Sequence, residues 1–477
     1  MWQSTPMNVM DYHSTRGQAP AVGFEEALLR GLAPDGGLYV PEHWPTISSS
    51  TLAGFRGATF AEVAARLLAP YAAGAFDYKA LHGLAEKAYG SFDHKAVAPL
   101  VRLGAKDFIM ELHHGPTLAF KDVAMQFLGR LFDAVLERRD RRVSIIGATS
   151  GDTGAAAIEA FRGQDRVDVF ILHPKGRVSE VQRRIMTSVQ DENIHNIAIE
   201  GSFDDCQRIV KAMFRDQKFS ESVGLGGVNS INWVRLAVQI VYYFTAIADY
   251  AADGERLSFV VPTGNFGDIF AGYAAKRMGA PMNTLCVAVN DNDILARAIN
   301  TGEYQPRGVR ITSSPSMDIQ VASNFERLIY EAGGRNAEDT RAFIAAVDTP
   351  TGARMNPHTL AEIRRDFSAE TADEHETAEA IAAHLAATDA LIDPHTAVGV
   401  VALEKARLRG EIPGPAVVLS TAHPAKFPKA VKDACGREPA LPNRFSDLYD
   451  RPEKLLDAAN EVEAIKAIVR DRTRVGG

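Results

Sequence analysis

The fold class is decided by the stretch VSIIGATSGDTGAAAIEAFRGQDRVDVFILHP, residues 143–174. It begins with a short run rich in β-branched residues and passes through a polar, glycine-containing loop into an alanine-rich helical segment. A second strand-like run ends it. Strand, helix and strand in this order are typical of a βαβ unit, whose two strands lie parallel in one sheet. The stretch therefore predicts an α/β fold in which helices cover both faces of a parallel sheet.

The same alternation continues along the chain, with further strand-like runs in IHNIAIEG (194–201), LSFVVPTGN (257–265), TLCVAVN (284–290) and PAVVLSTAHPAKF (415–427). Ligands of parallel sheets bind beyond the carboxyl ends of the strands. This rule draws attention to the loops after residues 149, 262 and 419. We expect most strands from about residue 140 onward to share the larger of two domains. Residues 1–100 are expected to be mostly helical, and the acidic stretch 366–390 to form an exposed pair of helices.

The composition is that of a soluble globular protein. Of the 477 residues, 46% are hydrophobic and 23% charged, and 52 basic residues against 60 acidic ones give a net charge of −8. An acidic chain without a long basic run is a poor candidate for binding nucleic acid or an anionic membrane. The N-terminus lacks the pattern of a signal peptide. The apolar stretch 233–251 contains charged residues, which favours a buried helix over a membrane span.

The cysteines indicate a reducing compartment. There are three, they are far apart and they form no CxxC pair, namely Cys206, Cys286 and Cys435. This spacing gives neither a disulfide framework nor a zinc site. His113 and His114 are adjacent, so both cannot face one metal ion from a regular element, and we assign no metal. We expect the protein to be cytoplasmic.

One lysine has an unusual position. In HHGPTLAFKDVAMQFLG (113–129), Lys121 opens an amphipathic helix, where the helix dipole disfavours a cation, and apolar residues surround it. Both effects lower the pKa of an amine, and a neutral amine is what Schiff-base chemistry requires. The alternative is a surface lysine that extends past apolar residues beside the carboxylate of Asp122. On the residues alone, that alternative is favoured.

Two polar loops have the form of anion sites. ATSGDTGAAA (148–157) and PTGNFGDIFAGYAAKRMG (262–279) each join a strand to a helix through small residues. Backbone N–H groups at a helix start bind anions, and two such loops in one sheet domain suggest a ligand with two anionic groups. The alternatives are a plain helix cap made by Asp152 or Ser150, and a simple tight turn at Gly264. Neither loop fits a dinucleotide or P-loop motif.

A buried arginine is predicted in GGVNSINWVRLA (226–237). Arg235 enters the apolar helix, and a buried cation usually requires an anionic partner. That partner is either a structural carboxylate or an anion of the substrate. Arg16, in HSTRG, is open to the same two interpretations.

Together these segments resemble the threonine synthase family of pyridoxal-phosphate enzymes, which have the tryptophan synthase β-like fold. The resemblance runs from about residue 11 to about residue 435 and points to the longer proteobacterial and fungal type. The motifs that carry it are HSTRG, GLAPDGGLYVPEHWP, HGPTLAFKD, ATSGDTGAAA, NSINWVR, PTGNFGDIFAGY, DPHTAVGV and LSTAHPAKFP. It implies fold type II, with two parallel-sheet domains and a cleft between them. It also implies a helical N-terminal portion, residues 1–100, ahead of a catalytic core, residues 101–477, of two interleaved subdomains.

The resemblance also implies the roles of individual residues. Lys121 matches the lysine that forms the Schiff base with pyridoxal 5′-phosphate, and Thr421 matches the hydroxyl that faces the pyridine nitrogen. Asp152 matches a cofactor-binding position at which many relatives outside this family carry Asn near the 3′-oxygen of the cofactor. The cofactor phosphate is implied to bind at Gly264, Asn265, Phe266, Gly267 and Asp268. The substrate carboxylate is implied to bind at Thr149, Ser150, Gly151 and Thr153, and the substrate phosphate at Asn229, Ser230, Arg235 and Arg16.

The implied reaction converts O-phospho-L-homoserine and water to L-threonine and phosphate, without an obligate protein partner. Three other functions remain open. A phospholyase or dehydratase of the same fold would release a keto acid instead. A non-catalytic amino-acid-binding protein would show no Schiff-base absorbance. A nucleotide-dependent phosphotransferase would require the Walker motif that is missing here.

Overall fold

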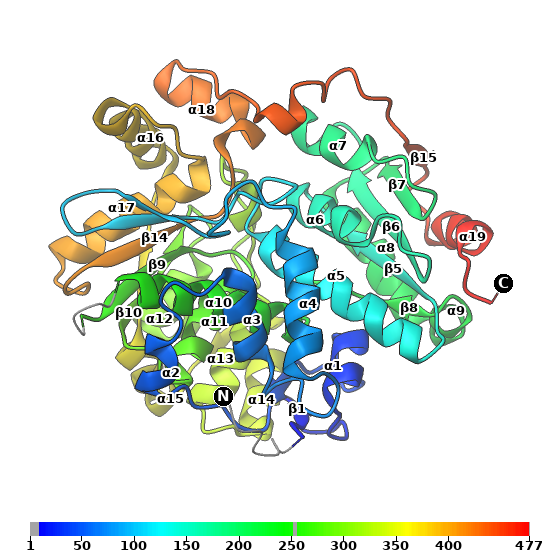
Figure 1. Cartoon of the computed structure of the whole chain (residues 1–477), viewed down its shortest axis with the longest axis horizontal. Helices are drawn as coiled ribbons and strands as arrows, with labels where there is room; N and C mark the ends of the chain where they lie inside the picture. The colour runs from blue at the N-terminus through cyan, green and yellow to red at the C-terminus, as the bar shows by residue number, and fades with distance from the viewer. Residues whose placement is uncertain (1–8, 251–254, 477) are drawn as a thin grey trace.

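The computed structural model describes residues 9–250 and 255–476. Residues 1–8, the start of the segment without a signal-peptide pattern, and Ala251, the end of the predicted apolar helix, lie outside the described residues. Two separate sheets with helices around them form the body of the molecule (Figure 1). The α/β class with parallel sheets is confirmed.

The first sheet has five strands and is parallel throughout. Its order is β15 (Leu456–Ala458), β7 (Ile194–Ile199), β6 (Val167–Pro174), β5 (Val143–Ala148) and β8 (Leu225–Gly226). Every residue of β6 is buried. A strand covered by helices on both faces reads as a continuous apolar run, and for this reason the sequence 143–174 predicted it well.

The second sheet has six strands and combines distant parts of the chain. Its order is β13 (Phe367–Thr371), β10 (Met282–Val289), β9 (Leu257–Pro262), β14 (Ala416–Ser420), β4 (Phe108–Glu111) and β3 (Leu100–Arg102). All neighbours are parallel except β3 and β4. Two short antiparallel ribbons complete the strands, β1 (Tyr12–Ser14) with β2 (Tyr39–Pro41) and β11 (Glu303–Tyr304) with β12 (Ala353–Arg354).

Two expectations about the sheets were wrong. The strands after residue 140 do not share one sheet, because β9, β10, β13 and β14 lie in the six-stranded sheet. The two anion-type loops therefore follow strands of different sheets, β5 and β9. The reason is that strand pairing depends on contacts between distant residues, such as Val417 of β14 beside Phe108 of β4. The division of the chain at residue 100 stays a prediction.

The expectation for residues 366–390 was also wrong in part. Only the second half is a helix, α16 (Glu374–Thr388), whereas Phe367–Thr371 form the edge strand β13. The first four residues of β13 are buried, and the strand pairs in parallel with β10 from Leu285 to Val289. Polar residues in FSAET obscured this strand, because its burial comes from packing rather than from its own composition.

The remaining helices cover the sheets and form the N-terminal portion. Those of the N-terminal portion are α1 (Phe24–Arg30), α2 (Ser49–Ala53), α3 (Phe60–Leu68) and α4 (Tyr78–Tyr89). The chain continues with α5 (Lys121–Arg138), α6 (Asp152–Phe161), α7 (Glu180–Thr187), α8 (Phe203–Arg215), α9 (Gln217–Ser222), α10 (Trp233–Tyr250) and α11 (Gly267–Arg277). The later helices are α12 (Ile294–Thr301), α13 (Phe325–Ala332), α14 (Ala337–Val347), α15 (Pro357–Asp366), α17 (Pro394–Leu408), α18 (Pro428–Cys435) and α19 (Val462–Arg472). Single 3₁₀ turns occur at Pro315–Met317, Pro424–Lys426 and Asn443–Phe445.

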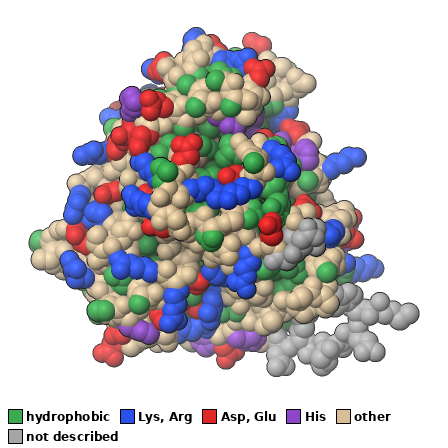
Figure 2. Space-filling view, turned by 90° about the vertical axis from the view of Figure 1, so that its left-hand side faces the viewer, with side chains coloured by type: hydrophobic (Ala, Val, Ile, Leu, Met, Phe, Trp, Pro, Cys, Tyr) green, Lys and Arg blue, Asp and Glu red, His purple; other side chains and the backbone are tan. Residues whose placement is uncertain are grey.

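The apolar segment is a buried helix, as predicted. Most side chains of α10 are inaccessible to solvent, and the helix packs against α3, α5 and α11. In the ranges that the structure describes, no helix combines the length and apolarity that a membrane crossing requires. On the face shown in Figure 2, basic and acidic side chains are interspersed.

Candidate active site

Lys121 lies at the first position of α5, and its backbone is fixed to the end of β14. The N–H of Phe120 donates a hydrogen bond to the carbonyl of Thr421 at 2.9 Å, and Ala119 forms a β-bridge with Ala422. The lysine is only 8% exposed. Burial lowers the pKa of its amine. The structure therefore favours the reactive amine over the surface lysine.

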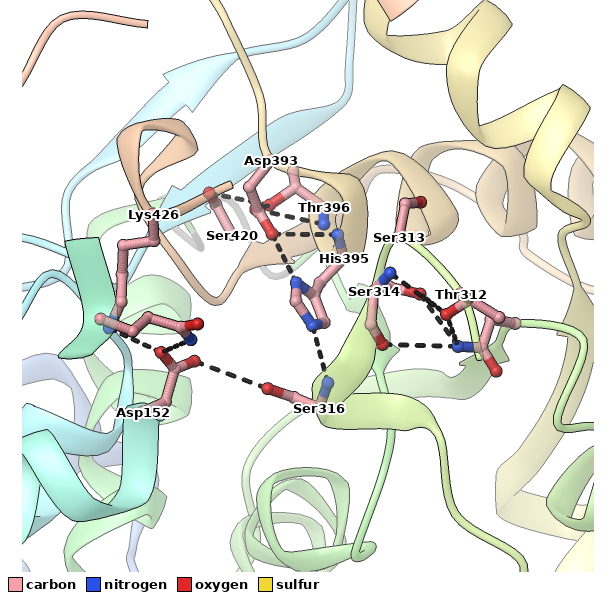
Figure 3. A network of polar contacts seen from close by, with 12 residues as sticks. Asp152, Thr312, Ser313, Ser314, Ser316, Asp393, His395, Thr396, Ser420 and Lys426 are labelled. Atoms are coloured by element: carbon pink, nitrogen blue, oxygen red, sulfur yellow. Dashed lines mark hydrogen bonds and ion pairs between the residues drawn. The ribbon is translucent and has the colours of Figure 1, made fainter. Parts of the chain in front are cut away.

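Asp152 lies between two lysines. Its Oδ2 is 3.3 Å from Nζ of Lys121. Its Oδ1 is 2.6 Å from Nζ of Lys426 (Figure 3). Nε2 of Gln182 donates a further hydrogen bond to Oδ1 at 2.8 Å. Burial acts to raise the pKa of Asp152, but the two ammonium groups outweigh it and hold the pKa well below its usual range. Asp152 is therefore a carboxylate that touches the candidate reacting amine.

The loop before α6 is capped by a residue other than the two expected. The hydroxyl of Thr149 accepts hydrogen bonds from the N–H groups of Gly151 and Gly154, both at 2.9 Å. Asp152 and Ser150 form no such cap, so both residues named for it were wrong, and the cap is made by Thr149. Gly151 has φ of 139°, and a Cβ there would come within 2.6 Å of the Gln182 side chain. Ser150 and Thr153 are half-buried at the same helix start.

The loop before α11 has backbone positions at which other parts of the chain come very close. Phe266 has a left-handed backbone with φ of 63°, and its buried ring packs against Phe325 and Phe367. A Cβ at Gly264 would lie 2.3 Å from the carbonyl oxygen of Ser316. The helix begins at Gly267, and the first N–H groups of a helix have no partner within it. These N–H groups are suited to an anion such as a phosphate.

Asn324 joins this loop to a second predicted segment. Its amide donates to the carbonyl of Asn265 at 3.0 Å and to the carbonyl of Ser230 at 3.1 Å. Asn229, next to Ser230, is exposed. The structure therefore brings the predicted cofactor-phosphate loop beside two of the residues predicted to bind the substrate phosphate.

Asp268 is turned toward α10. Its Oδ1 accepts hydrogen bonds from the hydroxyls of Tyr242 and Tyr243, and its Oδ2 has no partner among the described residues. Burial raises the pKa of Asp268 to about 6, against the hydrogen bonds from the two tyrosines.

Arg235 is a buried cation that lacks an ion pair with any described residue. The guanidinium makes one hydrogen bond, from Nη1 to the carbonyl of Val228 at 3.4 Å, and the residue is 3% exposed. Burial lowers the pKa of Arg235 to about 10. Of the two interpretations offered by the sequence, a structural carboxylate partner is not what the structure shows, and an anion of the substrate remains.

Arg16 is different. It forms a two-point ion pair with Glu326, from Nε to Oε1 at 3.1 Å and from Nη2 to Oε2 at 3.0 Å. Glu326 also accepts a hydrogen bond from the hydroxyl of Thr15 at 2.6 Å. A structural carboxylate thus occupies this guanidinium and ties the N-terminal segment to α13. The predicted contact of Arg16 with substrate stays a prediction.

Sequence reasoning missed several residues that hold the site together. Lys426 and His395 were within quoted motifs but received no role, and Gln182, Ser316 and Asn324 gave no signal. Nδ1 of His395 is 2.7 Å from Asp393, and its Nε2 accepts a hydrogen bond from the N–H of Ser316 at 3.2 Å (Figure 3). This pair supports the Ser316 turn between Gly264 and Asp152.

The arrangement fits an aldehyde cofactor that carries a phosphate. A buried amine of lowered pKa can attack a carbonyl carbon. The start of α11 can bind a phosphate, and no carboxylate of a described residue is bonded to Arg235. Lys121, the loop at Gly264 and the carbonyl of Thr421 come from different parts of the chain but meet beyond the carboxyl ends of the strands.

Comparisons with known proteins agree with this geometry. Family models match over residues 11–89 ("Threonine synthase N terminus"), 93–422 ("Pyridoxal-phosphate dependent enzyme") and 396–469 ("Threonine synthase, C-terminal"). The chain is 49% identical to threonine synthase from Pseudomonas aeruginosa over 461 residues, 96% of this chain and 98% of that protein.

Solved structures show the same relationship. The crystal structure of threonine synthase with PLP bound from Brucella melitensis has a TM-score of 0.94 and 51% identity, over 98% of this chain and all of that chain. The yeast threonine synthase has a TM-score of 0.92 and 37% identity, with 97% and 98% of the two chains covered. The chain described here therefore belongs to the threonine synthase family of pyridoxal-phosphate-dependent enzymes.

Proposed function

We propose that this chain converts O-phospho-L-homoserine and water to L-threonine and phosphate, with pyridoxal 5′-phosphate as its cofactor. The observation that carries the proposal is the buried amine of Lys121 between Asp152 and the end of β14. Family membership supports the reaction. The cofactor, when bound, supplies an aldehyde that takes up the amino group of the substrate and a ring that delocalises the charge left when Cα loses a proton.

The proton transfers are assigned to Lys121. Lys121 is the first residue of α5. Burial lowers the pKa of its amine toward the range in which an amine acts as a base. In the proposed reaction it removes the Cα proton and later returns a proton to the substrate. Asp152 remains ionised at the same amine and orients it.

The binding of the two phosphates is assigned to adjacent segments. The N–H groups from Gly264 to Gly267 hold the cofactor phosphate, and Asn229, Ser230 and Arg235 hold the substrate phosphate. Support for this division comes from Asn324, which bridges the two segments, and from Arg235, which has no ion pair with a described residue. A guanidinium in a buried site binds a phosphate more strongly than one exposed to water.

The remaining assignments concern the substrate carboxylate and the cofactor ring. The loop of Thr149, Ser150, Gly151 and Thr153 binds the carboxylate through those N–H groups at the start of α6 that do not already donate to the hydroxyl of Thr149. Thr421 would offer its hydroxyl to the pyridine ring of the cofactor. Asp152 would also hold the cofactor, and Asp268 would support the start of α11 behind the phosphate loop through its hydrogen bonds to Tyr242 and Tyr243.

We also propose a cytoplasmic location and no obligate protein partner. All three cysteines are free, which is compatible with a reducing compartment. Mixed charges on the face in Figure 2 give no basic surface there for nucleic acid.

Product identification tests the reaction. The purified, cofactor-loaded protein is incubated with O-phospho-L-homoserine, and the products are separated and quantified. Threonine and phosphate in equal amounts are expected. Phosphate with 2-oxobutyrate and ammonia would instead establish a phospholyase on the same cofactor. Absence of any turnover would contradict both reactions.

A further inference from the structure

Two ammonium groups share the carboxylate of Asp152, one at each oxygen. Lys426 is fully buried, and its Nζ contacts Oδ1 of Asp152 at 2.6 Å and the carbonyl of Thr117 at 2.8 Å. Lys121 contacts Oδ2 at the longer distance of 3.3 Å. The carboxylate is therefore bound more closely to the lysine that has no part in the proposed chemistry.

We propose that Lys426 is a positioning residue that holds Asp152 at the reacting amine and thereby tunes that amine. The inference rests on the proposed function in one respect, because it takes Lys121 as the group that reacts with the aldehyde of the cofactor. Lys426 itself touches neither the cofactor nor the substrate in this proposal. It acts only through the carboxylate and through its own charge.

A permanent counterion is needed because Lys121 cannot be one. The amine of Lys121 must lose its proton to react, and at that stage it no longer compensates a buried negative charge. A buried carboxylate without another counterion opposes the loss of the proton from Lys121, because that loss would leave its charge uncompensated. Lys426 remains in place at every stage, so Asp152 stays ionised and its Oδ2 stays directed at Lys121.

Lys426 is held rigidly enough for this purpose. Its second acceptor, Thr117, lies in a turn that is fixed by Asp122, whose carboxylate accepts hydrogen bonds from the N–H of Thr117 at 2.7 Å and from its hydroxyl at 2.6 Å. Both Thr117 and Asp122 are at most 1% exposed. The turn, the lysine and Asp152 thus form one continuous buried network that ends at Lys121.

The charges around Lys121 predict in which direction its pKa changes when Lys426 or Asp152 is replaced. Burial lowers the pKa of its amine, Asp152 raises it, and Lys426 and Arg235 lower it again. Asp268 and Asp122 are buried nearby, and burial raises the pKa of each to about 6. The buried His395–Asp393 pair reaches Asp152 through Ser316, whose hydroxyl lies 3.5 Å from Oδ2. Loss of Lys426 therefore raises the pKa of Lys121, whereas loss of Asp152 lowers it.

The experiment measures the ionisation of Lys121 without measuring turnover. Pyridoxal, which lacks the phosphate, is mixed with the full-length apoenzyme, and the rate of imine formation is followed by absorbance from pH 6 to pH 11. Only the neutral amine reacts, so the midpoint of the rate profile reports its pKa. The profile of Lys121→Ala, which contains every other lysine, is subtracted.

Four variants separate the possibilities. Lys426→Met is expected to move the midpoint upward by about one unit or more, because Asp152 then pairs with Lys121 alone. Lys426→Arg keeps the charge and is expected to restore the midpoint toward that of the unmodified chain. Asp152→Asn is expected to move it downward. In an Asp152→Asn background, Lys426→Met is expected to have a clearly smaller effect, because the carboxylate through which it acts is missing.

Three results would overturn the inference. An unchanged midpoint in Lys426→Met means that this lysine does not act on Lys121. An equal shift in both backgrounds means that its charge acts directly and not through Asp152. If Lys426→Met does not fold, as judged by circular dichroism, a midpoint that fails to fall in Asp152→Asn decides against the proposal. Failure of the proposed function is distinct, because Lys121→Ala would then react with pyridoxal as fast as the unmodified chain.

Discussion

Two buried cations lie near the amine of Lys121, and they differ in what compensates them. Lys426, after β14, has a carboxylate at 2.6 Å and a carbonyl at 2.8 Å. Arg235, in the first turn of α10, has one carbonyl at 3.4 Å and no ion pair with a described residue. Both residues are nearly inaccessible to solvent.

This difference distinguishes a charge that stabilises the folded chain from a charge that binds a ligand. Burying an ion costs several kcal/mol unless a partner compensates it, so a protein retains an uncompensated one where a ligand supplies the partner. By this argument the charge of Lys426 is structural, because it is paired within the protein, whereas the charge of Arg235 serves to bind an anionic ligand. The following predictions test that contrast.

The largest effect is expected at the amine itself. Lys121→Ala removes the only group that we assign to proton transfer at Cα, and threonine formation should fall by a factor on the order of 10³ or more. The visible absorbance of the Schiff base should also disappear from the cofactor-loaded protein. Steady-state assay and the absorbance spectrum are the measurements.

Added amines provide the control for that variant. If Lys121 is a proton-transfer group and not only a tether, exogenous methylamine should restore part of the lost rate. Full activity of Lys121→Ala would show that another group performs the transfer and would remove the basis of the site described here.

The next effect concerns the uncompensated cation. Arg235→Gln removes two or more charge-assisted hydrogen bonds to the proposed substrate phosphate, so kcat/KM should fall about 100-fold. The free energy of unfolding of the cofactor-free chain should be unchanged or higher, because an unpaired buried charge is removed. Steady-state kinetics and urea unfolding measure the two quantities.

Arg16 is the matched comparison. Its guanidinium is paired with Glu326, which is 5% exposed. Arg16→Gln should therefore lower the free energy of unfolding by about 1–3 kcal/mol, because it leaves a buried carboxylate with fewer partners. If the guanidinium serves only this ion pair, its loss leaves KM for the substrate unchanged. A raised KM without loss of stability would instead confirm the predicted substrate contact of Arg16. If the two arginine variants changed the kinetics and the free energy of unfolding in the same way, the contrast between paired and unpaired cations would be wrong.

The sequence identified most of the residues but not the way in which they meet. Lys121 could be predicted, because a lysine that opens an amphipathic helix is unusual in any fold. The loops at Thr149 and Gly264 could be predicted from their position between strand and helix. Their placement in different sheets could not, since it depends on pairing between residues some three hundred positions apart, such as Phe108 and Val417.

The role of Lys426 shows a second limit. A lysine inside HPAKFP has no periodicity or spacing that distinguishes it from a surface lysine. Its burial follows from the turn that returns the chain after β14 to Thr117. The sequence around Asn324 and Ser316 gives no signal either, because each residue acts through contacts with segments that only the fold brings near. Local patterns therefore indicate which groups can react, whereas the groups that position them become visible only in three dimensions.

The smallest effect concerns Asp268, the remaining charge near Arg235. Burial raises the pKa of Asp268 to about 6, so the folded chain keeps a proton that the unfolded chain releases above about pH 4. The stability that this proton contributes is complete below pH 4 and is lost as the pH rises through 6. Asp268→Asn should remove a fall on the order of 1–3 kcal/mol in the free energy of unfolding between pH 4 and pH 7.

Urea unfolding of the cofactor-free chain and of Asp268→Asn, at several pH values, measures this difference. Asp122 has a similarly raised pKa but is present in both proteins, so the difference between the two curves reports Asp268 alone. If the two curves run parallel, Asp268 is ionised in the folded chain throughout this range. It would then serve as a charge partner of Arg235 across a distance longer than an ion pair, and Arg235 would no longer count as uncompensated. A difference that grows between pH 4 and pH 6 shows instead that burial disfavours the charged form of Asp268 more than Arg235 stabilises it, which leaves the substrate phosphate as the main partner of Arg235.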